Sequence, residues 1–433
     1  MTTNTQPQRV FFYGWVIVGV LAIARGLGLA LGMLNFGLFI APMGQELNIG
    51  RSTFGWASSL RTMGSGVTSP FLGRLVDRFG SRYLLAISVG LIGTALFLIG
   101  HITHPWQMIV LFTVAGLMPI SGPAALVTTV PVSKWFVRKR GRAIGWLLLI
   151  NSFCAIGLMP LSQVLIDTFG WRTAWMVIGS VAVGIIVPFS LIFMRKIPED
   201  LGLTPDGENR IEKPLNEKQA RDSEADEVSW TVREAMSSSI FWRLLIVSCV
   251  TMFGTSTMVL HRLPHFMDRG LDPQLVASSI GLEVAMAGIS ILTLGYLAER
   301  LPARYLSGTA TIVSAIAIIF TITTNTRFML FVSMGTFGIG VGGGQLLRDF
   351  IWAEYFGRKN LGSIRGIVNP IMLAFGAIGP PLAGYVWDLT GTYSSIWWVS
   401  AGLVLSSAIL LYLTPPPKKR LCKSNSDGTI PPH

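Results

Sequence analysis

Charged residues are scarce in this sequence. Asp, Glu, Lys and Arg make up 13% of its 433 residues, whereas hydrophobic residues make up 51% and the mean hydropathy is +0.56. A water-soluble chain of this length needs roughly twice that share of charge to cover its surface. Lipid must therefore cover much of this surface, and an ordinary soluble domain is excluded.

Cysteine and catalytic motifs are also scarce. The three cysteines, Cys154, Cys249 and Cys422, are scattered, so they predict neither a disulfide framework nor a metal site. The sequence has no nucleotide P-loop, zinc-protease motif or serine elbow. A G-x-G-x-x-G match at Gly338 lies inside an apolar run and follows no strand, which argues against a dinucleotide site. We expect no enzyme activity, no cofactor and no metal.

The net charge of +12 is spread over short basic clusters between apolar runs. This distribution argues against nucleic-acid binding, which needs a basic patch or tail. Lys and Arg are concentrated in alternate loops, such as those at 74–82, 134–142 and 358–365. Under the positive-inside rule, these loops and both termini are predicted to be cytoplasmic.

Apolar runs of about 20 residues are long enough to cross a bilayer core about 30 Å thick. They predict about twelve spans, at 13–41, 52–73, 83–101, 106–133, 141–167, 173–194, 240–266, 274–297, 303–323, 327–353, 363–388 and 394–414. The predicted organisation is an all-α membrane protein with an N-terminal six-helix bundle (1–194), a cytoplasmic linker (195–239), a C-terminal six-helix bundle (240–414) and a cytoplasmic tail (415–433). The linker is charged and poor in aromatics, so it is predicted to be disordered or locally helical.

Three sequence patterns occur twice, in the same order and at nearly equal offsets. GRLVDRFGSRYL around Asp77 matches GYLAERLPARYL around Glu299. WFVRKRGRAIG at Trp135 matches YFGRKNLGSIRG at Tyr355, and DTFGWRTAW matches DLTGTYSSIW. An even number of helices in each half predicts a parallel repeat, related by an axis along the membrane normal.

The pattern Gly73-x-Leu75-x-Asp77-Arg78-x-Gly80-x-Arg82 resembles the loop signature of the major facilitator superfamily. This resemblance implies two six-helix bundles around a central cavity that opens alternately to each side. FYGW at Phe12, KWFVRKRGRAIG, PEDLGLTPDG and LPHFMDRGLD are similar to bacterial oxalate/formate-antiporter and monocarboxylate-transporter-like permeases. Monocarboxylate carriers of that group usually have a basic residue in helix 1 and an Asp and an Arg in helix 8. In this chain Asn35 occupies the basic site of helix 1, and helix 8 has only Glu283, with no arginine before Arg300. Helix 11 lacks the mid-membrane lysine of the oxalate carriers.

The loop signature has a physical role. Asp77 can accept hydrogen bonds from Arg78 or from free N–H groups at the N-terminus of a neighbouring helix. The resemblance implies that this cluster latches the cytoplasmic side in the outward-open state, and Glu299 with Arg300 can do the same in the second half. The alternative is a charge cluster that only sets topology. The predicted gating residues are Gly73, Asp77, Arg78, Gly80, Arg82, Glu299 and Arg300.

Ionisable residues within the spans indicate the substrate. An arginine at a helix centre costs about 2.5–3.5 kcal/mol, and Arg25, Arg61 and Arg348 all occupy such positions. In the superfamily, helices 1, 4, 7 and 10 line the cavity. Arg25 and Arg348 lie in helices 1 and 10, so we expect the cavity of this chain to be cationic and to attract an anion. The alternative is internal pairing, such as Arg348 with Glu283. The predicted substrate-binding residues are Arg25, Asn35, His261 and Arg348.

Two mid-membrane acids, Glu283 and Asp349, are candidates for proton coupling. Desolvation favours the neutral carboxyl, whereas a nearby arginine favours the ionised form, so protonation of Glu283 could follow substrate occupancy. A structural hydrogen-bonding glutamate is the alternative.

These observations predict a multi-pass secondary transporter of the bacterial inner membrane. We expect it to carry a small organic anion, a mono- or dicarboxylate, by alternating access. Proton symport and anion exchange are both open. The alternatives are an exporter of amphipathic or drug-like compounds and a non-transporting sensor on the same fold. The expected partners are the substrate, a co-transported proton and the lipid bilayer, with the protein a monomer.

Overall fold

All regular elements are helical in the part of the chain that the computed structural model describes, namely residues 12–30, 33–117, 128, 131–132, 135–136, 140–195, 198–204, 230–298, 300–357 and 360–417. The N-terminal half contains α1 (Gly14–Ala30), α2 (Met33–Leu47), α3 (Arg51–Phe79), α4 (Ser81–Ile99), α5 (Pro105–Gly116), α7 (Arg140–Phe193) and the 3-10 turn η1 (Pro198–Leu201). The C-terminal half contains α9 (Val232–Ser237), α10 (Ser239–Val259), α11 (Arg262–Asp268), α12 (Pro273–Ala298), α13 (Ala303–Thr323), α14 (Arg327–Phe356), α15 (Leu361–Thr390) and α16 (Ser394–Tyr412).

Eight helices within the described residues are long and apolar enough to cross a membrane. α7 covers two of the predicted spans and turns between them at Gly170. α1 and α2 lie along the first predicted span, whereas the span predicted at 106–133 is described only in part. α3 is not among the eight, because its sequence is too polar and includes Arg61 within the span. The count of twelve stays a prediction.

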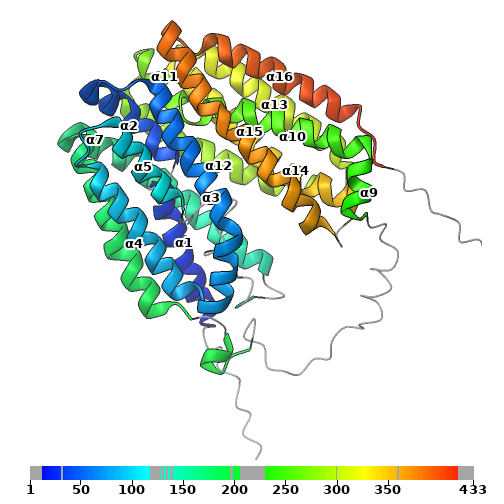
Figure 1. Cartoon of the computed structure of the whole chain (residues 1–433), viewed down its shortest axis with the longest axis horizontal. Coiled ribbons are helices and arrows are strands. Elements are labelled where there is room, and N and C mark those ends of the chain that lie inside the picture. The colour runs from blue at the N-terminus through cyan, green and yellow to red at the C-terminus, as the bar shows by residue number, and fades with distance from the viewer. Residues whose placement is uncertain are drawn as a thin grey trace, which may run out of the picture.

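The two halves lie side by side and converge at one end (Figure 1). Among the described residues, the main contacts between helices of the two halves are α3 with α15, α7 with α12, and α2 with α11. The N-terminus of α3 and the C-terminus of α15 lie at the end where the halves converge, which we call the Arg51 end. The opposite end, where α3 finishes, is called the Arg78 end.

The sequence repeat is visible in the packing of each half. In the first half, Phe136 of the first WFVRKRG motif packs against Trp15 of α1, with ring centroids 5.0 Å apart. In the second half, Phe356 at the matching position packs against Phe241 of α10, with ring centroids 6.2 Å apart. Each motif therefore anchors the first long helix of its own half.

The third repeated pattern is matched in the backbone. Gly170 and Gly391 lie three residues after the paired aspartates Asp167 and Asp388, and both have positive φ, 79° and 69°. Glycine adopts this conformation without the steric cost that a Cβ would bring. Both residues lie where a membrane helix ends, but their ψ angles are 161° and 6°, so the two positions share the positive φ and not the whole backbone conformation.

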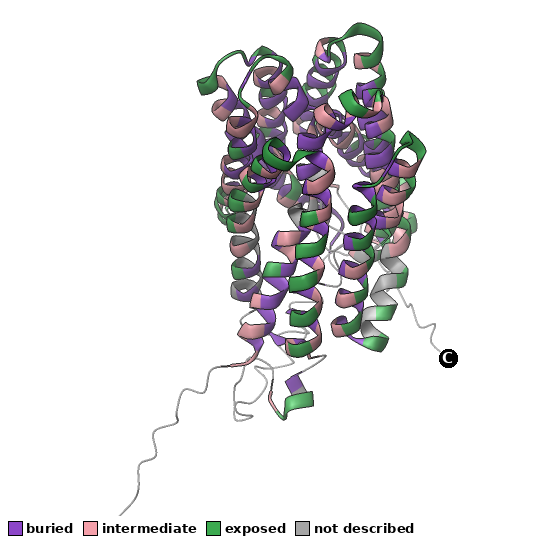
Figure 2. Cartoon of the chain, turned by 90° about the vertical axis from the view of Figure 1, so that its left-hand side faces the viewer, coloured by how far each residue is buried: buried purple, intermediate pink, exposed green. Residues whose placement is uncertain are grey.

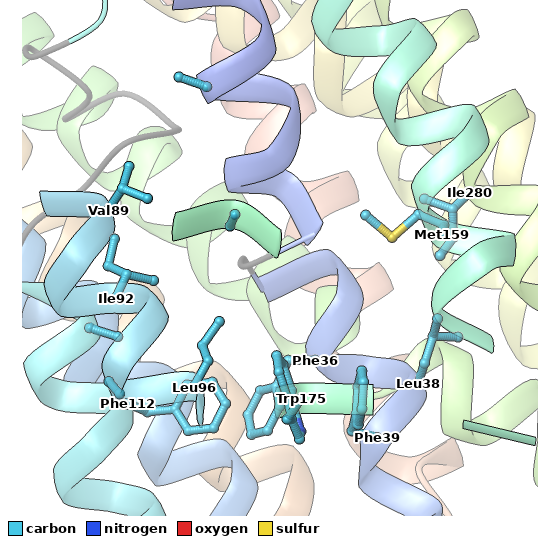
Figure 3. Close-up of a cluster of buried hydrophobic side chains, with 14 of the residues drawn as sticks. Phe36, Leu38, Phe39, Val89, Ile92, Leu96, Phe112, Met159, Trp175 and Ile280 are labelled. Carbon is cyan, nitrogen blue, oxygen red and sulfur yellow. The ribbon is translucent and has the colours of Figure 1, made fainter. Parts of the chain in front are cut away.

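Large aromatic side chains fill the core of the N-terminal half at the Arg51 end. Phe39 stacks on Trp175 at 4.0 Å, and Phe36 lies 4.1 Å from Phe112 (Figure 3). Exposed residues lie along the outer faces of the helices and buried ones between them (Figure 2). Within a bilayer, close packing of this kind rather than water exclusion holds helices together.

A short helix forms within the segment predicted to be a linker. α9 begins with a capping box, in which the Thr231 hydroxyl accepts from Glu234 N and the Glu234 carboxylate accepts from Thr231 N. Trp230 N donates to Phe356 O, and the Trp230 ring packs edge-on against the Phe356 ring. This end of the linker is therefore attached to the C-terminal half.

Candidate functional site

The first residues of α3 bind a carboxylate from the opposite half. Arg51 N donates to Asp388 Oδ1 at 2.7 Å, and Ser52 N donates to Asp388 Oδ2 at 3.0 Å. The first N–H groups of a helix have no partner within the helix, and the helix dipole favours a negative charge there. Asp388, at the end of α15, thus caps α3 across the boundary between the halves.

The Arg51 side chain adds a second connection at the same place. Its guanidinium makes a bidentate ion pair with Asp268 of α11, with both N–O distances 2.7 Å. It also lies 3.8 Å above the ring of Trp387. Arg51 is only 7% exposed, whereas the Asp268 side chain is 37% exposed, so the pair is shielded from solvent on the arginine side alone.

Hydrogen bonds continue from Arg51 into the protein with a defined direction. Arg51 Nη1 donates to the Tyr393 hydroxyl at 2.8 Å, and burial raises the pKa of Tyr393, which keeps its proton. His261 Nε2 lies 2.8 Å from Pro380 O and must donate, because a carbonyl oxygen only accepts. His261 Nδ1 is then free to accept from Tyr393, at 3.2 Å. We call Arg51, Asp268, Asp388, Tyr393 and His261 the Arg51 cluster.

Below this cluster, α3 and α15 approach closely. A Cβ at Gly55 would lie 2.5 Å from Pro380 O, so only glycine fits at this crossing. Ser59 Oγ donates to Ala377 O at 2.5 Å. Ala377 O lacks its usual helical donor, because the residue four positions later, Pro381, has no N–H. The two halves therefore satisfy each other's backbone groups here.

The other two pairs of helices are close in the same way. A Cβ at Gly37 of α2 would lie 2.9 Å from Leu263 of α11, and one at Gly281 of α12 would lie 3.0 Å from Ile156 of α7. Together with α3 and α15, these contacts close the Arg51 end.

A cavity of about 900 Å³ begins where these contacts stop. Towards the Arg51 end, its lining reaches Ser59 and Pro380. Towards the Arg78 end, it reaches Ile351 near the C-terminus of α14 and Arg365 near the N-terminus of α15. The described residues lining it include two cations and no Asp or Glu. They are Ser59, Thr62, Met63, Gly66, Val67, Leu244, Val247, Ser248, Thr251, Met252, Thr255, Ser256, Val259, Ser307, Thr311, Ser314, Gly340, Val341, Gly344, Gln345, Arg348, Ile351, Arg365, Gly366, Asn369, Pro370, Met372, Leu373, Ala374, Gly376, Ala377, Pro380 and Leu411.

Arg348 of α14 is the predicted binding residue that the structure places in this cavity. Its Nη1 lies 3.9 Å from the Met252 sulfur, which is a weak acceptor. Arg365 also lines the cavity and lies close enough to Arg348 to interact with it electrostatically. A guanidinium such as that of Arg348, facing a cavity with no Asp or Glu among its described lining residues, attracts anions.

The other three predicted binding residues are not among the described lining residues. Arg25 Nη1 lies 3.5 Å from Thr128 Oγ1, within the N-terminal half. Asn35 is fully buried, and His261 belongs to the Arg51 cluster. Their roles in substrate binding stay predictions.

Glu283 pairs with Arg262 and not with Arg348. Arg262 Nη2 lies 2.5 Å from Glu283 Oε2, both side chains are buried, and the guanidinium lies 4.2 Å above the ring of Phe337. The internal pairing considered for Arg348 is therefore not what this structure has.

The loop signature is described in part. Gly80 has a φ of 78° at the turn between α3 and α4, which accounts for glycine at that place in the motif. The guanidinium of Arg82 lies 5.5 Å from the ring of Tyr83, and that of Arg300 lies 4.4 Å from the ring of Tyr296. Arg78 is exposed. The side chains of Asp77 and Asp349, the surroundings of Gly73 and the whole of Glu299 lie outside the described part.

The Arg51 cluster was not predicted as a site. In the sequence, Asp388 stands out only as the first residue of DLTGTYSSIW in the third repeated pattern. One signal was available in the sequence: Asp388 repeats Asp167 at the end of a membrane helix. An acid at such a place can bind the free N–H groups at the N-terminus of a neighbouring helix.

Comparisons with known proteins agree on the fold. A sequence profile described as the Major Facilitator Superfamily matches residues 19–292 and 263–431. Monocarboxylate transporter 11 of Mus musculus is 24% identical over 418 residues, which cover 92% of this chain and 86% of the relative. Monocarboxylate transporter 2 of Homo sapiens is 22% identical over 415 residues, which cover 93% and 85%.

Two solved structures resemble the chain along almost all of their length. A bacterial homologue of the human lysosomal transporter Spinster, in an inward-facing and unoccupied conformation, has a TM-score of 0.67 at 12% identity and covers 93% of this chain and 95% of its own. A mutant of the nucleoside transporter NupG has a TM-score of 0.70 at 15% identity and covers 92% and 99%.

Proposed function

The chain belongs to the Major Facilitator Superfamily, and we propose that it carries a small organic anion, a mono- or dicarboxylate, across the membrane by alternating access. The observation that carries this proposal is Arg348, which faces a cavity with no acidic side chain among its described lining residues. A guanidinium binds a carboxylate through two parallel hydrogen bonds. The names of the monocarboxylate transporters to which the chain is similar support the same substrate class.

The distribution of lysine and arginine supports an orientation with the Arg51 end outside the cell and the Arg78 end in the cytoplasm. In that orientation the structure represents the inward-facing state, closed by the Arg51 cluster and open through the cavity. Alternating access then requires the Arg51 cluster to separate while the Arg78 end closes, where the gating residues of the loop signature lie.

Proton coupling is proposed for Glu283, with Asp349 as a second candidate. The Glu283 carboxylate is buried with Arg262, so adding a proton to it would break the ion pair and leave a buried guanidinium in need of a new partner. Such a change would favour movement of α11 relative to α12. If Glu283 carries the proton, Glu283→Gln protein in sealed vesicles loses the pH dependence of uptake. Retention of the full pH dependence would exclude this role.

The first experiment is uptake of radiolabelled small carboxylates by proteoliposomes, with and without an inward proton gradient. We expect Arg348→Ala to abolish uptake, Arg348→Lys to retain part of it, and Arg327→Ala, at the exposed start of the same helix, to be unchanged. Uptake at the wild-type rate in Arg348→Ala would refute anion binding at this residue.

A second candidate function, export of amphipathic compounds, is favoured by the size of the cavity and its many apolar lining residues. It predicts transport of lipophilic neutral or cationic dyes that does not depend on Arg348. The same vesicles loaded with such dyes distinguish the two functions, because only the anion carrier is expected to need the guanidinium.

A further inference from the structure

The cavity continues beyond Arg348 into the interior of the C-terminal half. There it is lined by α10, α13, α14 and α16 rather than by the interface with α3. We call this part the recess and define it by six lining residues: Val247, Thr251, Thr311, Ser314, Gly344 and Leu411.

Glycines on α14 make the recess possible. Gly340, Gly344 and Arg348 are spaced by four residues and so lie on one face of the helix. A Cβ added at Gly344 would meet no atom within 4 Å, whereas one at Gly340 would lie 2.6 Å from Ser314 Oγ. The space beside Gly344 is thus on the same helix face as the guanidinium, one turn away.

The polar atoms of the recess are already hydrogen-bonded within the protein. The Thr311 hydroxyl donates to Ser307 O at 2.8 Å and the Ser314 hydroxyl to Ala310 O at 3.0 Å, while Thr251 bonds to Ser407 at 3.2 Å. These residues therefore present methyl and methylene groups more than free donors. The buried Ser307 hydroxyl, in the cavity lining nearby, has no partner among the described residues.

We propose that the recess is a subsite for the apolar tail of the transported anion, and that the substrate is an amphipathic monocarboxylate with an alkyl or aryl group. This inference rests on the proposed function, because the carboxylate is placed at Arg348. A second charge on the tail would be desolvated in the recess with no described counter-ion, which disfavours dicarboxylates. A volume of about 900 Å³ is in the range of pockets that hold molecules much larger than acetate.

The test is equilibrium binding to purified protein in nanodiscs, using acetate, butyrate, hexanoate and phenylpropionate, and the matching uncharged amides. Each methylene that enters the recess is expected to strengthen binding about fourfold. Gly344→Leu fills the recess from α14 and is expected to remove this dependence on tail length while leaving acetate binding intact. Gly402→Leu is the matched control, since Gly402 is exposed on α16 and also has open space.

Retained acetate binding shows that Gly344→Leu is folded. If that binding is lost, Thr311→Leu fills the recess from the opposite wall and provides the second test. Arg348-dependent binding of short carboxylates with no gain from longer tails would overturn the recess and leave the proposed function standing. Acids and amides that bind equally well, with a tail dependence that Gly344→Leu removes, would support the recess and refute anion recognition. A tail dependence that survives in both filled variants would also overturn the recess.

Discussion

Removing the Asp388 carboxylate should open the Arg51 end. Asp388→Ala deletes the acceptor of two backbone hydrogen bonds and a negative charge at the N-terminus of α3. Because Asp388 is exposed, we use the lower part of the usual range for each contribution, which gives about 1–2 kcal/mol in total. That corresponds to a shift of about five- to thirty-fold in the equilibrium between the closed and open Arg51 end.

The assay is electron-spin distance measurement between labels at Thr103 and Ser395, two exposed positions at the Arg51 end of different halves. The labels are placed in a background without the three native cysteines. The matched control is Asp167→Ala, because Asp167 holds the equivalent place in the repeat but accepts from Gln163 of its own helix, at 2.8 Å. We expect a longer distance to gain population in Asp388→Ala alone. Identical distance distributions in the two variants would refute the reasoning.

Three further results are expected. Gly55→Leu should separate the halves at the Arg51 end, because a side chain there collides with the α15 backbone; an unchanged label distance would contradict this. Glu283→Gln should lower the thermal midpoint, since an unpaired buried Arg262 costs about 3–5 kcal/mol, and changing both residues to methionine should restore most of it; equal midpoints in the single variant and wild type would count against the pair. The Arg172 guanidinium, with the Trp171 indole, holds the pKa of Glu46 below its ordinary value. The pair with Arg172 therefore stabilises the fold above the unfolded pKa and is lost as pH falls through the lower folded pKa. The small loss of thermal stability in Glu46→Gln should accordingly be present at pH 7 and absent in strong acid, and a difference that persists there would exclude this origin.

Repeated aromatic and glycine positions were the most reliable local signals in the sequence. The WFVRKRG motif and its second copy each place a phenylalanine under the first long helix of a half. Gly170 and Gly391 both adopt a positive φ at equivalent helix ends. These features could be predicted because they depend on residues close in sequence, or on a pattern that the chain repeats.

Charge pairing was harder to predict. The sequence indicated that arginines and acids within the spans must be offset, but it left open which acid serves which arginine. Glu283 pairs with Arg262, twenty-one residues away across the turn between α11 and α12, whereas Arg348 keeps a sulfur as its hydrogen-bond neighbour. Several pairings satisfy the same electrostatic requirement, and helix rotation selects one of them.

The amino-acid sequence by itself determined the membrane class, the two related halves and the presence of an arginine, Arg348, inside a membrane span, because hydropathy, repeats and desolvation cost depend on residue type and order. Only the tertiary structure decided that Asp388 caps α3 and that Arg51 joins Asp268, since these partners come from opposite halves. It also decided that the space beside Gly344 is open while that beside Gly340 is filled. The sequence does not distinguish these two glycines. The difference in open space beside them arises from the neighbouring helix that each one faces.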